Sequence, residues 1–229
     1  MEWTKEQEKI LKKYYPTIGS KVQMFLPDKT LNAIDHKVRN MGIKYGLVPE
    51  GLAGYFDIET SGLRADFAIM YTWTIKVAGE DKYYEGQITQ EEIMSGDSDK
   101  QLLIKLIDTL KLFRRIYTYY GTRFDIPFTR SRALSHGLDF LPYGLVEHKD
   151  IYYLARRVLC IHSNRLECVC DLLGIVGKNH LEPKVWIAAN TGKKEAIDYI
   201  AGHNKLDVII LEKVHKRLQE YELNPRRFM

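Results

Sequence analysis

The amino-acid sequence predicts an α/β protein with a mixed sheet flanked by helices, preceded by a small three-helix all-α domain. Residues 1–46 place apolar residues at helical spacing between capping and stop residues. Residues 54–88 alternate between apolar and polar residues, as strands do. Helical patterns predominate from residue 99 onward, with one strand-like segment among them. The length of 229 residues fits one α/β domain and a small additional module.

The first segment, residues 1–46, predicts three short helices. Thr4 and Thr30 are suitable N-caps for the first and the third helix. Pro16 is expected to stop the first helix, and Gly42 the third. The three helices are expected over residues 5–14, 20–26 and 30–41, and they are followed by a linker over 47–53 and a second domain over 54–229.

The second domain begins with strands and continues with helices. Ser98 is the expected cap of the helix that starts at residue 99. Asp150 is interpreted as the cap of a later helix, with a role as a fifth acidic ligand as the alternative. Strands are expected over residues 54–58, 67–77, 82–88 and 115–119, and helices over 99–112, 127–136, 151–159, 165–173 and 194–221.

Composition excludes several classes of protein. The chain is 45% hydrophobic and 28% charged, which is ordinary for a globular protein. Its polar start and its short apolar runs predict neither a signal peptide nor a membrane span, so we expect a protein of the cytoplasm of a bacterial or phage-infected cell. The three cysteines favour buried thiols in a reducing compartment over disulfides, and zinc binding by Cys160, His162, Cys168 and Cys170 is the less favoured alternative.

Two acids end the first strand-like segment. Asp57 and Glu59 are one residue apart, so strand alternation places both side chains on one face. Two carboxylates this close repel each other unless a cation lies between them. A solvated strand end with two exposed acids is the alternative interpretation.

Further polar residues follow at the ends of later elements. Asp125 comes after a strand-like segment and a turn at Gly121, directly before a helix opened by Pro127, and capping of that helix is its alternative role. His203 and Asp207 are four residues apart on the last long helix, so they share one face of it. Apolar neighbours indicate that this face packs near the sheet, whereas a solvated ion pair is the alternative.

Together these acids resemble the three motifs of the DEDD exonuclease superfamily, which has a ribonuclease H-like fold. The resemblance covers residues 53–215, and its motifs are Asp57-x-Glu59, Gly121-x-x-Phe124-Asp125-x-Pro127 and a terminal-helix Asp207. The third motif departs from the superfamily, which has Tyr-x3-Asp or His-x4-Asp, because this chain has His203-x3-Asp207. The subclass therefore stays open. The last part of the chain also resembles a phage and bacterial branch of ribonuclease H-like nucleases, through Trp186, Ala188, Gly192, Ala196, Tyr199, His203, Asn204, Asp207 and Val208.

The resemblance implies a 3′–5′ exonuclease that hydrolyses phosphodiester bonds with two divalent ions. Carboxylate ligands favour Mg²⁺ or Mn²⁺ over zinc. A histidine near the attacking water can take its proton, which is the role implied for His203. The implied metal ligands are Asp57, Glu59, Asp125 and Asp207.

The resemblance also implies contacts with the terminal nucleotide. Thr60 is expected near the 3′-hydroxyl and Leu63 against the base, whereas a simple turn after the strand is the alternative. Arg132, on the helix that follows Asp125, is expected to hold a phosphate, and a bond to a structural carboxylate is equally compatible with its position.

The front segment resembles a Myb/SANT-type helix-turn-helix. The resemblance covers residues 2–44 and rests on the Trp3, Pro16, Gly19 and Thr30 positions within its apolar pattern. This segment holds nine lysine or arginine residues against five acids, while the rest of the chain is neutral, which favours contact with phosphates. The third helix of such a fold enters the major groove, and binding of a protein is the alternative. The residues expected to face DNA are Asn32, His36, Lys37, Arg39 and Asn40, and the lysines available to phosphates are Lys21, Lys29, Lys37 and Lys44.

Two functions from different classes follow from these patterns. The favoured one is a nuclease that removes nucleotides from 3′ ends, because all four acids are present. The other is a DNA-binding protein whose ribonuclease H-like domain is an inactive scaffold. Endonuclease or RNA-directed cleavage is a third possibility, since no residue identifies a contact with a 2′-hydroxyl. Nucleic acid, DNA rather than RNA, is the expected partner, no membrane is expected, and the oligomeric state stays open.

Overall fold

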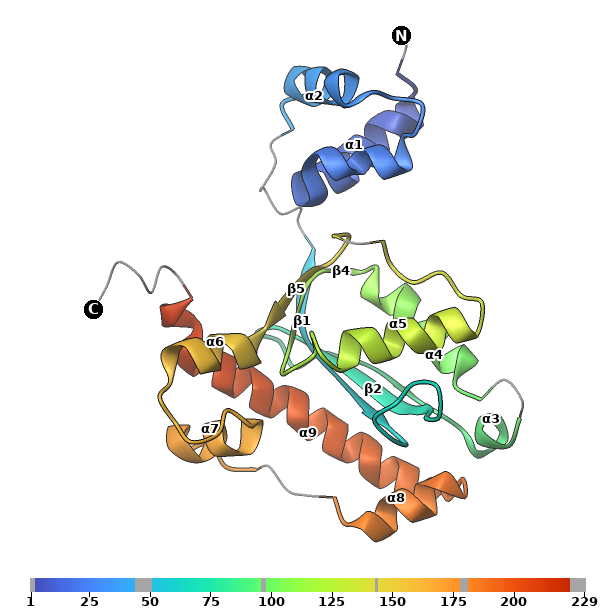
Figure 1. Cartoon of the computed structure of the whole chain (residues 1–229), viewed down its shortest axis with the longest axis vertical. Coiled ribbons are helices and arrows are strands. Elements are labelled where there is room, and N and C mark those ends of the chain that lie inside the picture. The colour runs from blue at the N-terminus through green and yellow to red at the C-terminus, as the bar shows by residue number, and fades with distance from the viewer. Residues whose placement is uncertain (1–2, 44–50, 96–97, 143, 178–180, 223–229) are drawn as a thin grey trace.

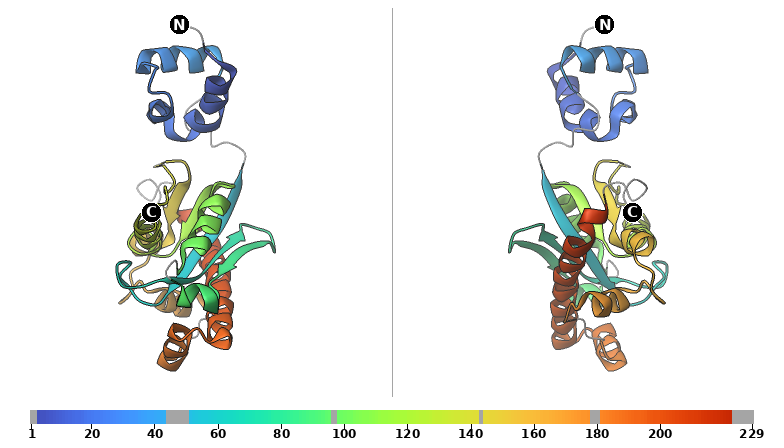
Figure 2. Two further views of the ribbon diagram at one scale, coloured as in Figure 1. Left: turned by 90° about the vertical axis from the view of Figure 1, so that its right-hand side faces the viewer. Right: turned by 90° about the vertical axis from the view of Figure 1, so that its left-hand side faces the viewer.

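A computed structural model describes residues 3–43, 51–95, 98–142, 144–177 and 181–222 of the chain. A small helical module forms one end of the molecule, and a larger α/β part forms the rest (Figure 1). The small module lies beyond the end of the sheet at which β1 begins, as the side views show (Figure 2). The two parts meet where the Ile18 side chain packs against the backbone of Gly144.

The small module contains α1 (Lys5–Ile18), a 3₁₀ helix η1 (Gly19–Phe25) and α2 (Leu31–Asn40). Thr4 and Thr30 cap the two α-helices through their side chains, as expected. We expected Pro16 to stop α1, and this expectation was wrong because the helix continues to Ile18. A proline near the end of a helix removes one hydrogen bond, and here the last turn buries Ile18 before Gly19 ends the helix. The core of the module comprises Leu11, Tyr15, Ile18, Val22, Leu26, Ile34 and Val38.

The larger part is built on a five-stranded mixed sheet, which confirms the predicted fold class. Its strand order is β3-β2-β1-β4-β5. β1 runs parallel to β4, and β4 parallel to β5, whereas β2 is antiparallel to both β1 and β3. The strands are β1 (Leu52–Thr60), β2 (Met70–Val77), β3 (Tyr83–Gln87), β4 (Phe113–Thr118) and β5 (Glu147–Asp150).

Helices cover both faces of the sheet (Figures 1 and 2). α4 and α5 pack on one face, with Phe56 and Ile58 of β1 in the core below them. α6, α7 and α9 pack on the other face, where Tyr55 joins a second core. Since strand side chains alternate, Asp57 and Glu59 lie on the α9 side. The helices are α3 (Gln90–Met94), α4 (Lys100–Leu110), α5 (Asp125–Ser135), α6 (Ile151–Val158), α7 (Leu166–Leu173), α8 (Pro183–Asn190), α9 (Lys194–Leu218) and a 3₁₀ helix η2 (Gln219–Tyr221).

Several expected boundaries were wrong. β1 begins at Leu52, inside the expected linker, and β2 begins only at Met70 because residues 61–69 form a turn. The N-cap of α4 is Asp99 rather than the expected Ser98, and its side chain makes no capping hydrogen bond because it is buried in an ion pair with Arg132. β5, α3 and α8 were not expected, because each is short, and Glu-His-Lys-Asp in β5 offers no apolar alternation.

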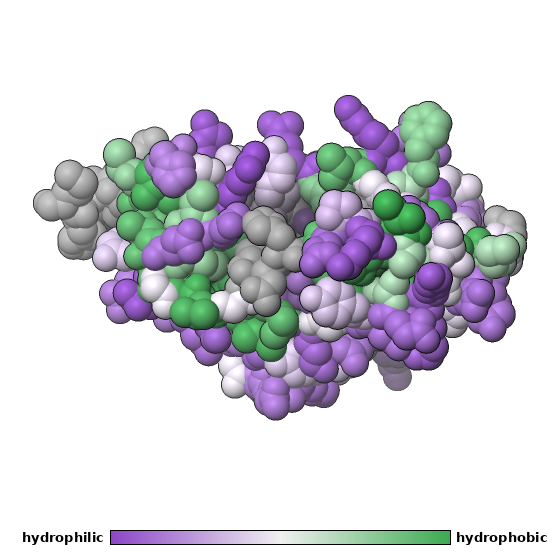
Figure 3. Space-filling view, turned by 90° about the horizontal axis from the view of Figure 1, so that it is seen from below, coloured by the Kyte–Doolittle hydropathy of each residue, from purple (hydrophilic) through white to green (hydrophobic). Residues whose placement is uncertain are grey.

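No helix among the described residues is long and apolar enough to cross a membrane. Exposed apolar side chains are spread over several elements, such as Met94 on α3, Ile187 on α8 and Leu206 on α9. From the side where α8 lies, apolar residues form separate clusters between hydrophilic ones (Figure 3). Such scattered exposure is ordinary for a folded surface.

Candidate active site

The end of β1 places two acids beneath α9. Asp57 lies opposite Thr74 and Glu59 opposite Thr72 in the antiparallel pairing with β2. The pairing is irregular between Glu59 and Thr60, where the chain leaves the sheet for the turn. Both acids are half-buried, whereas their strand neighbours Phe56 and Ile58 are buried on the opposite face. The expectation that the two carboxylates share one face is therefore confirmed.

Glu59 meets two residues of α9. Nδ1 of His203 lies 3.5 Å from Oε1 of Glu59 and 3.7 Å from Oδ2 of Asp207. One potential ligand atom from each of the three residues lies within 4.8 Å of the others. The helical spacing of four places His203 and Asp207 on one face, and that face packs on the sheet as expected.

Asp57 is connected to the same helix through Asn204. Asn204 Nδ2 donates a hydrogen bond of 2.7 Å to Oδ2 of Asp57, and the Asn204 side chain is completely buried. Asn204 was part of the family resemblance, but no role was assigned to it. The signal in the sequence is its position three residues before Asp207, which places an amide on the same side of the helix, and a buried amide needs a polar partner.

Asp125 lies against β1 between the other two acids. Its Oδ1 accepts a hydrogen bond of 3.2 Å from the backbone N–H of Ile58. Asp125 is the first residue of α5, and Phe124 is the N-cap, so the alternative role as the cap is not what the structure shows. Burial raises the pKa of Asp125 to about 7, opposed by hydrogen bonds from its own backbone N–H and that of Ile58, and assisted by the charges of Asp150 and Glu59.

These residues fit a divalent cation. Carboxylate oxygens and one imidazole nitrogen converge within 4.8 Å in Glu59, His203 and Asp207, and the carboxylate oxygens among them are donors that suit Mg²⁺ or Mn²⁺. A cation would also offset the repulsion between acids crowded around one strand end. Elsewhere in the described ranges, no other group of three histidine, cysteine or acidic side chains meets at such distances.

The residues expected to touch a terminal nucleotide lie beyond the end of β1. Thr60 donates a hydrogen bond of 2.7 Å from Oγ1 to the carbonyl of Gly62, so the hydroxyl shapes the turn. Leu63 is 80% exposed on that turn. Thr60 directly follows Glu59, and Leu63 comes four residues after it.

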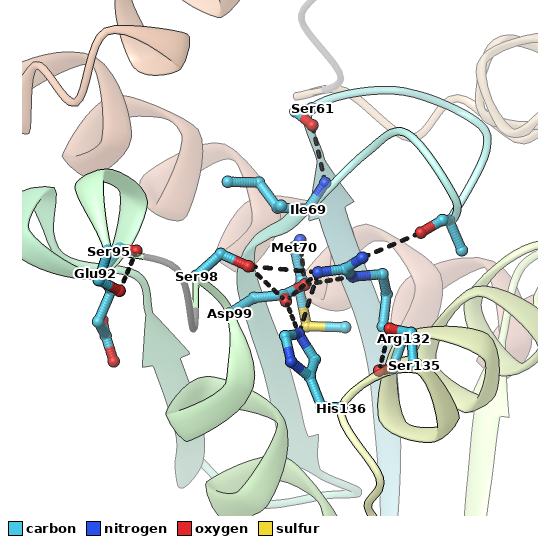
Figure 4. A network of polar contacts seen from close by, with 11 residues as sticks. Ser61, Ile69, Met70, Glu92, Ser95, Ser98, Asp99, Arg132, Ser135 and His136 are labelled. Carbon is cyan, nitrogen blue, oxygen red and sulfur yellow. Dashed lines mark hydrogen bonds and ion pairs between the residues drawn. The ribbon is translucent and has the colours of Figure 1, made fainter.

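The structure does not support the expected phosphate contact of Arg132. It shows the alternative, a bond between Arg132 and a structural carboxylate. Its guanidinium donates to both carboxylate oxygens of Asp99, from Nε at 3.0 Å and from Nη2 at 2.7 Å (Figure 4). Nη1 also donates to the carbonyl of Ala65 in the turn. Burial raises the pKa of Asp99, but hydrogen bonds from Arg132, from the Met70 N–H and from His136 outweigh it and hold the pKa below its usual range.

Asp150 caps α6, as interpreted from the sequence. Its carboxylate accepts hydrogen bonds from the N–H groups of Tyr152 at 3.1 Å, Tyr120 at 2.8 Å and Thr122 at 2.9 Å. The last two bonds come from the turn between β4 and α5, so Asp150 also holds that turn.

The cysteines match the expectation of buried thiols only in part. Cys170 is buried, Cys168 is half-buried and Cys160 is exposed. Cys168 Sγ lies 3.7 Å from Nε2 of His162. Cys168 and Cys170 are two positions apart on α7, so their side chains point to different faces of the helix.

The small module exposes most of the residues expected to face DNA. Asn32, His36, Arg39 and Asn40 are exposed on α2. Lys37 is instead held by Glu8 through an ion pair of 2.6 Å. Lys29, expected to meet phosphates, is buried beside Asp28 with its ammonium over the ring of Trp3, because its long apolar stem covers the small core. Lys21 is exposed, and Lys44 lies outside the described residues.

Comparisons with known proteins agree with the fold. The sequence pattern of the RNase_H superfamily matches residues 54–219. A DNA polymerase of Methanocaldococcus jannaschii is 34% identical over 98 aligned residues, which cover 34% of this chain and 6% of that polymerase. The family B DNA polymerase of Pyrobaculum calidifontis superposes with a TM-score of 0.60 at 15% identity, over 78% of this chain and 26% of that polymerase. The chain thus spans a minor part of both polymerases.

Proposed function

Because the chain belongs to the RNase_H superfamily, we propose that it is a divalent-metal-dependent 3′–5′ exonuclease acting on DNA. The convergence of Glu59, His203 and Asp207 within 4.8 Å carries the proposal. Asp57 and Asp125 support it, since hydrogen bonds hold both at the same strand end. The names of the two similar proteins, both DNA polymerases, favour DNA over RNA.

Each side chain has a distinct task in this proposal. Glu59, Asp207, Asp57 and Asp125 would hold the cations, and Asn204 orients Asp57. When bound, divalent cations would supply a nucleophilic water and would offset the charge of the phosphate. His203 takes the proton of the attacking water, since its Nδ1 lies beside both Glu59 and Asp207.

Binding of the terminal nucleotide involves the turn after β1. Leu63, which is 80% exposed, packs against the terminal base, and the backbone around Thr60 meets the 3′-hydroxyl. The small module adds affinity for duplex DNA through the exposed face of α2, which carries Asn32, His36, Arg39 and Asn40. These assignments extend the resemblance found in the sequence to the surfaces that the structure exposes.

The decisive experiment uses a single-stranded DNA labelled at its 5′ end, with Mg²⁺, Mn²⁺ or EDTA. We expect a ladder that shortens from the 3′ end and requires the metal. Glu59→Gln and Asp207→Asn should reduce cleavage to background, because each removes a charged ligand. Glu195→Gln is the matched control, since Glu195 is an exposed acid on the same helix as Asp207.

Other products would point to other functions. Cleavage of the same strand with a blocked 3′ end would indicate an endonuclease. Release of nucleotides from RNA and not from DNA would show a ribonuclease. Intact strands together with tight binding would leave a DNA-binding protein with an inactive scaffold, and the proposal would be wrong.

A further inference from the structure

A hollow of about 500 Å³ lies between the edge strand β3 and α9. Thr72 and Thr74 of β2 line its floor, and they pair across the sheet with Glu59 and Asp57 of β1. The hollow therefore begins on the strand next to the acids, on the face of the sheet that α9 covers. Its volume falls within the usual range of small-molecule sites.

A polar contact joins β3 to α9 on either side of the hollow. On one side, Nε2 of Gln87 donates a hydrogen bond of 2.6 Å to Oδ1 of Asp198. On the other side, Nζ of Lys205 lies 3.4 Å from Oε2 of Glu85, so these two charges offset each other. The strand and the helix are thus bonded to each other around the space that they enclose.

A glycine keeps the α9 side of the hollow open. Gly202 lies in the interior of α9, where glycine is less favourable than alanine. A Cβ at this position would meet nothing within 4 Å, and its backbone is helical. Neither close packing nor backbone conformation therefore requires a glycine here, and its effect is to widen the hollow.

Two polar groups at the hollow have unused capacity for a ligand. Thr74 is only 1% exposed, yet none of the hydrogen bonds between the described residues uses its hydroxyl, whereas the Thr72 hydroxyl donates to the carbonyl of Gly86 at 2.8 Å. Lys105 reaches the rim from α4 and donates to the carbonyl of Glu85 at 2.9 Å. Within the described part of the chain, no carboxylate lies within ion-pair distance of Lys105. A buried hydroxyl favours a polar partner and an ammonium without a carboxylate favours an anion.

A ligand that fits these groups carries an anion at the rim and a neutral polar body inside. A nucleoside 5′-monophosphate has this form, and hydrolysis at the acids would release one from each 3′ end. We propose that the hollow binds a nucleoside 5′-monophosphate, with its phosphate at Lys105, at a site separate from the acids. This inference rests on the proposed function for the identity of the ligand.

The test measures binding of thymidine 5′-monophosphate to the full chain by isothermal titration calorimetry. EDTA is present, so that no cation at the acids attracts the phosphate. We expect one site per chain and much weaker binding of thymidine, which lacks the phosphate. Lys105→Gln should raise the dissociation constant about tenfold, as the loss of a hydrogen bond to a charged group does. Lys111→Gln is the matched control, because Lys111 is an exposed lysine at the end of the same helix, and it should leave the affinity unchanged.

A second pair of variants tests the space itself. Gly202→Leu places a large side chain at the hollow and should abolish detectable binding, while the helix is kept because leucine favours it more than glycine does. Gly202→Ala adds only a Cβ, which would meet nothing within 4 Å, and should retain most of the affinity. Unfolding curves establish that both variants are folded.

Equal affinity of the wild-type protein and a folded Gly202→Leu variant would overturn the inference, and so would an absence of binding to the wild-type protein. The assay is independent of catalysis. A protein that binds the nucleotide as expected but releases none from DNA would refute the exonuclease proposal alone.

Discussion

Asn204 Nδ2 donates a hydrogen bond of 2.7 Å to Oδ2 of Asp57, and this bond joins α9 to β1 across 147 residues of sequence. The Asn204 side chain is completely buried, so bulk water cannot replace Asp57 as the hydrogen-bond partner of its amide. The bond fixes one carboxylate oxygen of Asp57. Hydrogen bonds of this kind orient metal ligands in many proteins.

Replacement of Asn204 tests this orientation. Asn204→Ala should lower the cleavage rate or the apparent metal affinity by about 10–100-fold, the usual effect of removing a residue that positions a ligand. Initial rates measured against Mn²⁺ concentration separate the two effects. Lys205→Ala, at the next position of α9, is the control. A folded Asn204→Ala variant with the wild-type rate and metal dependence would show that Asp57 needs no such support.

His203 offers a sharper separation between a base and a ligand. His203→Ala should lower the turnover rate by about 10²–10⁴-fold, as loss of a general base does, while the metal dependence persists. His203→Tyr should keep measurable activity, because Tyr-x3-Asp is the spacing that this helix already has.

The pH dependence of the rate decides whether His203 acts as the base. An alanine variant that leaves both the rate and the acid limb unchanged would exclude that role. A parallel loss of metal affinity would identify His203 as a ligand instead, which its distances to Glu59 and Asp207 also permit.

The pair of Arg132 and Asp99 should contribute mainly to stability. Arg132→Ala leaves a fully buried carboxylate without its bidentate partner, which is expected to lower the free energy of unfolding by about 3–5 kcal/mol. Urea unfolding of both single variants and of the double variant measures the coupling. If Arg132 held a substrate phosphate instead, the variant would keep its stability and lose affinity for DNA.

His215 should make the protein less stable in mild acid. Burial lowers the pKa of His215, which packs against the rings of Tyr55 and Tyr117, although the charge of Glu222 acts in the opposite direction. An unfolded histidine titrates near pH 6.5, so the unfolded state binds the proton first as the pH falls. Stability is therefore full above about pH 6.5 and falls as the pH drops from there toward the lower folded pKa.

Melting temperatures between pH 8 and pH 5 check this sign. His215→Gln keeps a hydrogen-bonding group for the Tyr55 hydroxyl but does not titrate, so it should melt with a shallower dependence on pH. An identical slope in the two proteins would assign the dependence to other groups, such as the half-buried His148, whose pKa is also lowered by burial.

Removal of residues 1–46 should separate binding from chemistry. The truncated protein should bind duplex DNA more weakly and with a smaller dependence on salt, because the segment carries the basic excess of the chain. Cleavage of short single strands should be nearly unchanged, since the acids all lie on β1, α5 and α9. If the folded truncated protein no longer cleaved short strands, the small module and the larger α/β part would not be separable in function.

The sequence by itself determined the features that depend on neighbouring residues. Alternation placed Asp57 and Glu59 on one strand face, and a spacing of four placed His203 and Asp207 on one helix face. These patterns are local because each depends on the geometry of a single strand or helix. For the same reason the class of fold and the position of most elements followed from periodicity and capping residues.

Only the tertiary structure decided which distant side chains meet. Arg132 could have held a phosphate or a carboxylate, and the choice of Asp99 depends on how α5 packs beside the start of α4. The contact between Asn204 and Asp57 likewise requires α9 to cross β1 at one register. A buried polar group takes whichever partner the packing brings within hydrogen-bond distance, because burial without one is costly. Such partners are separated by many residues, so no periodicity in the sequence encodes them.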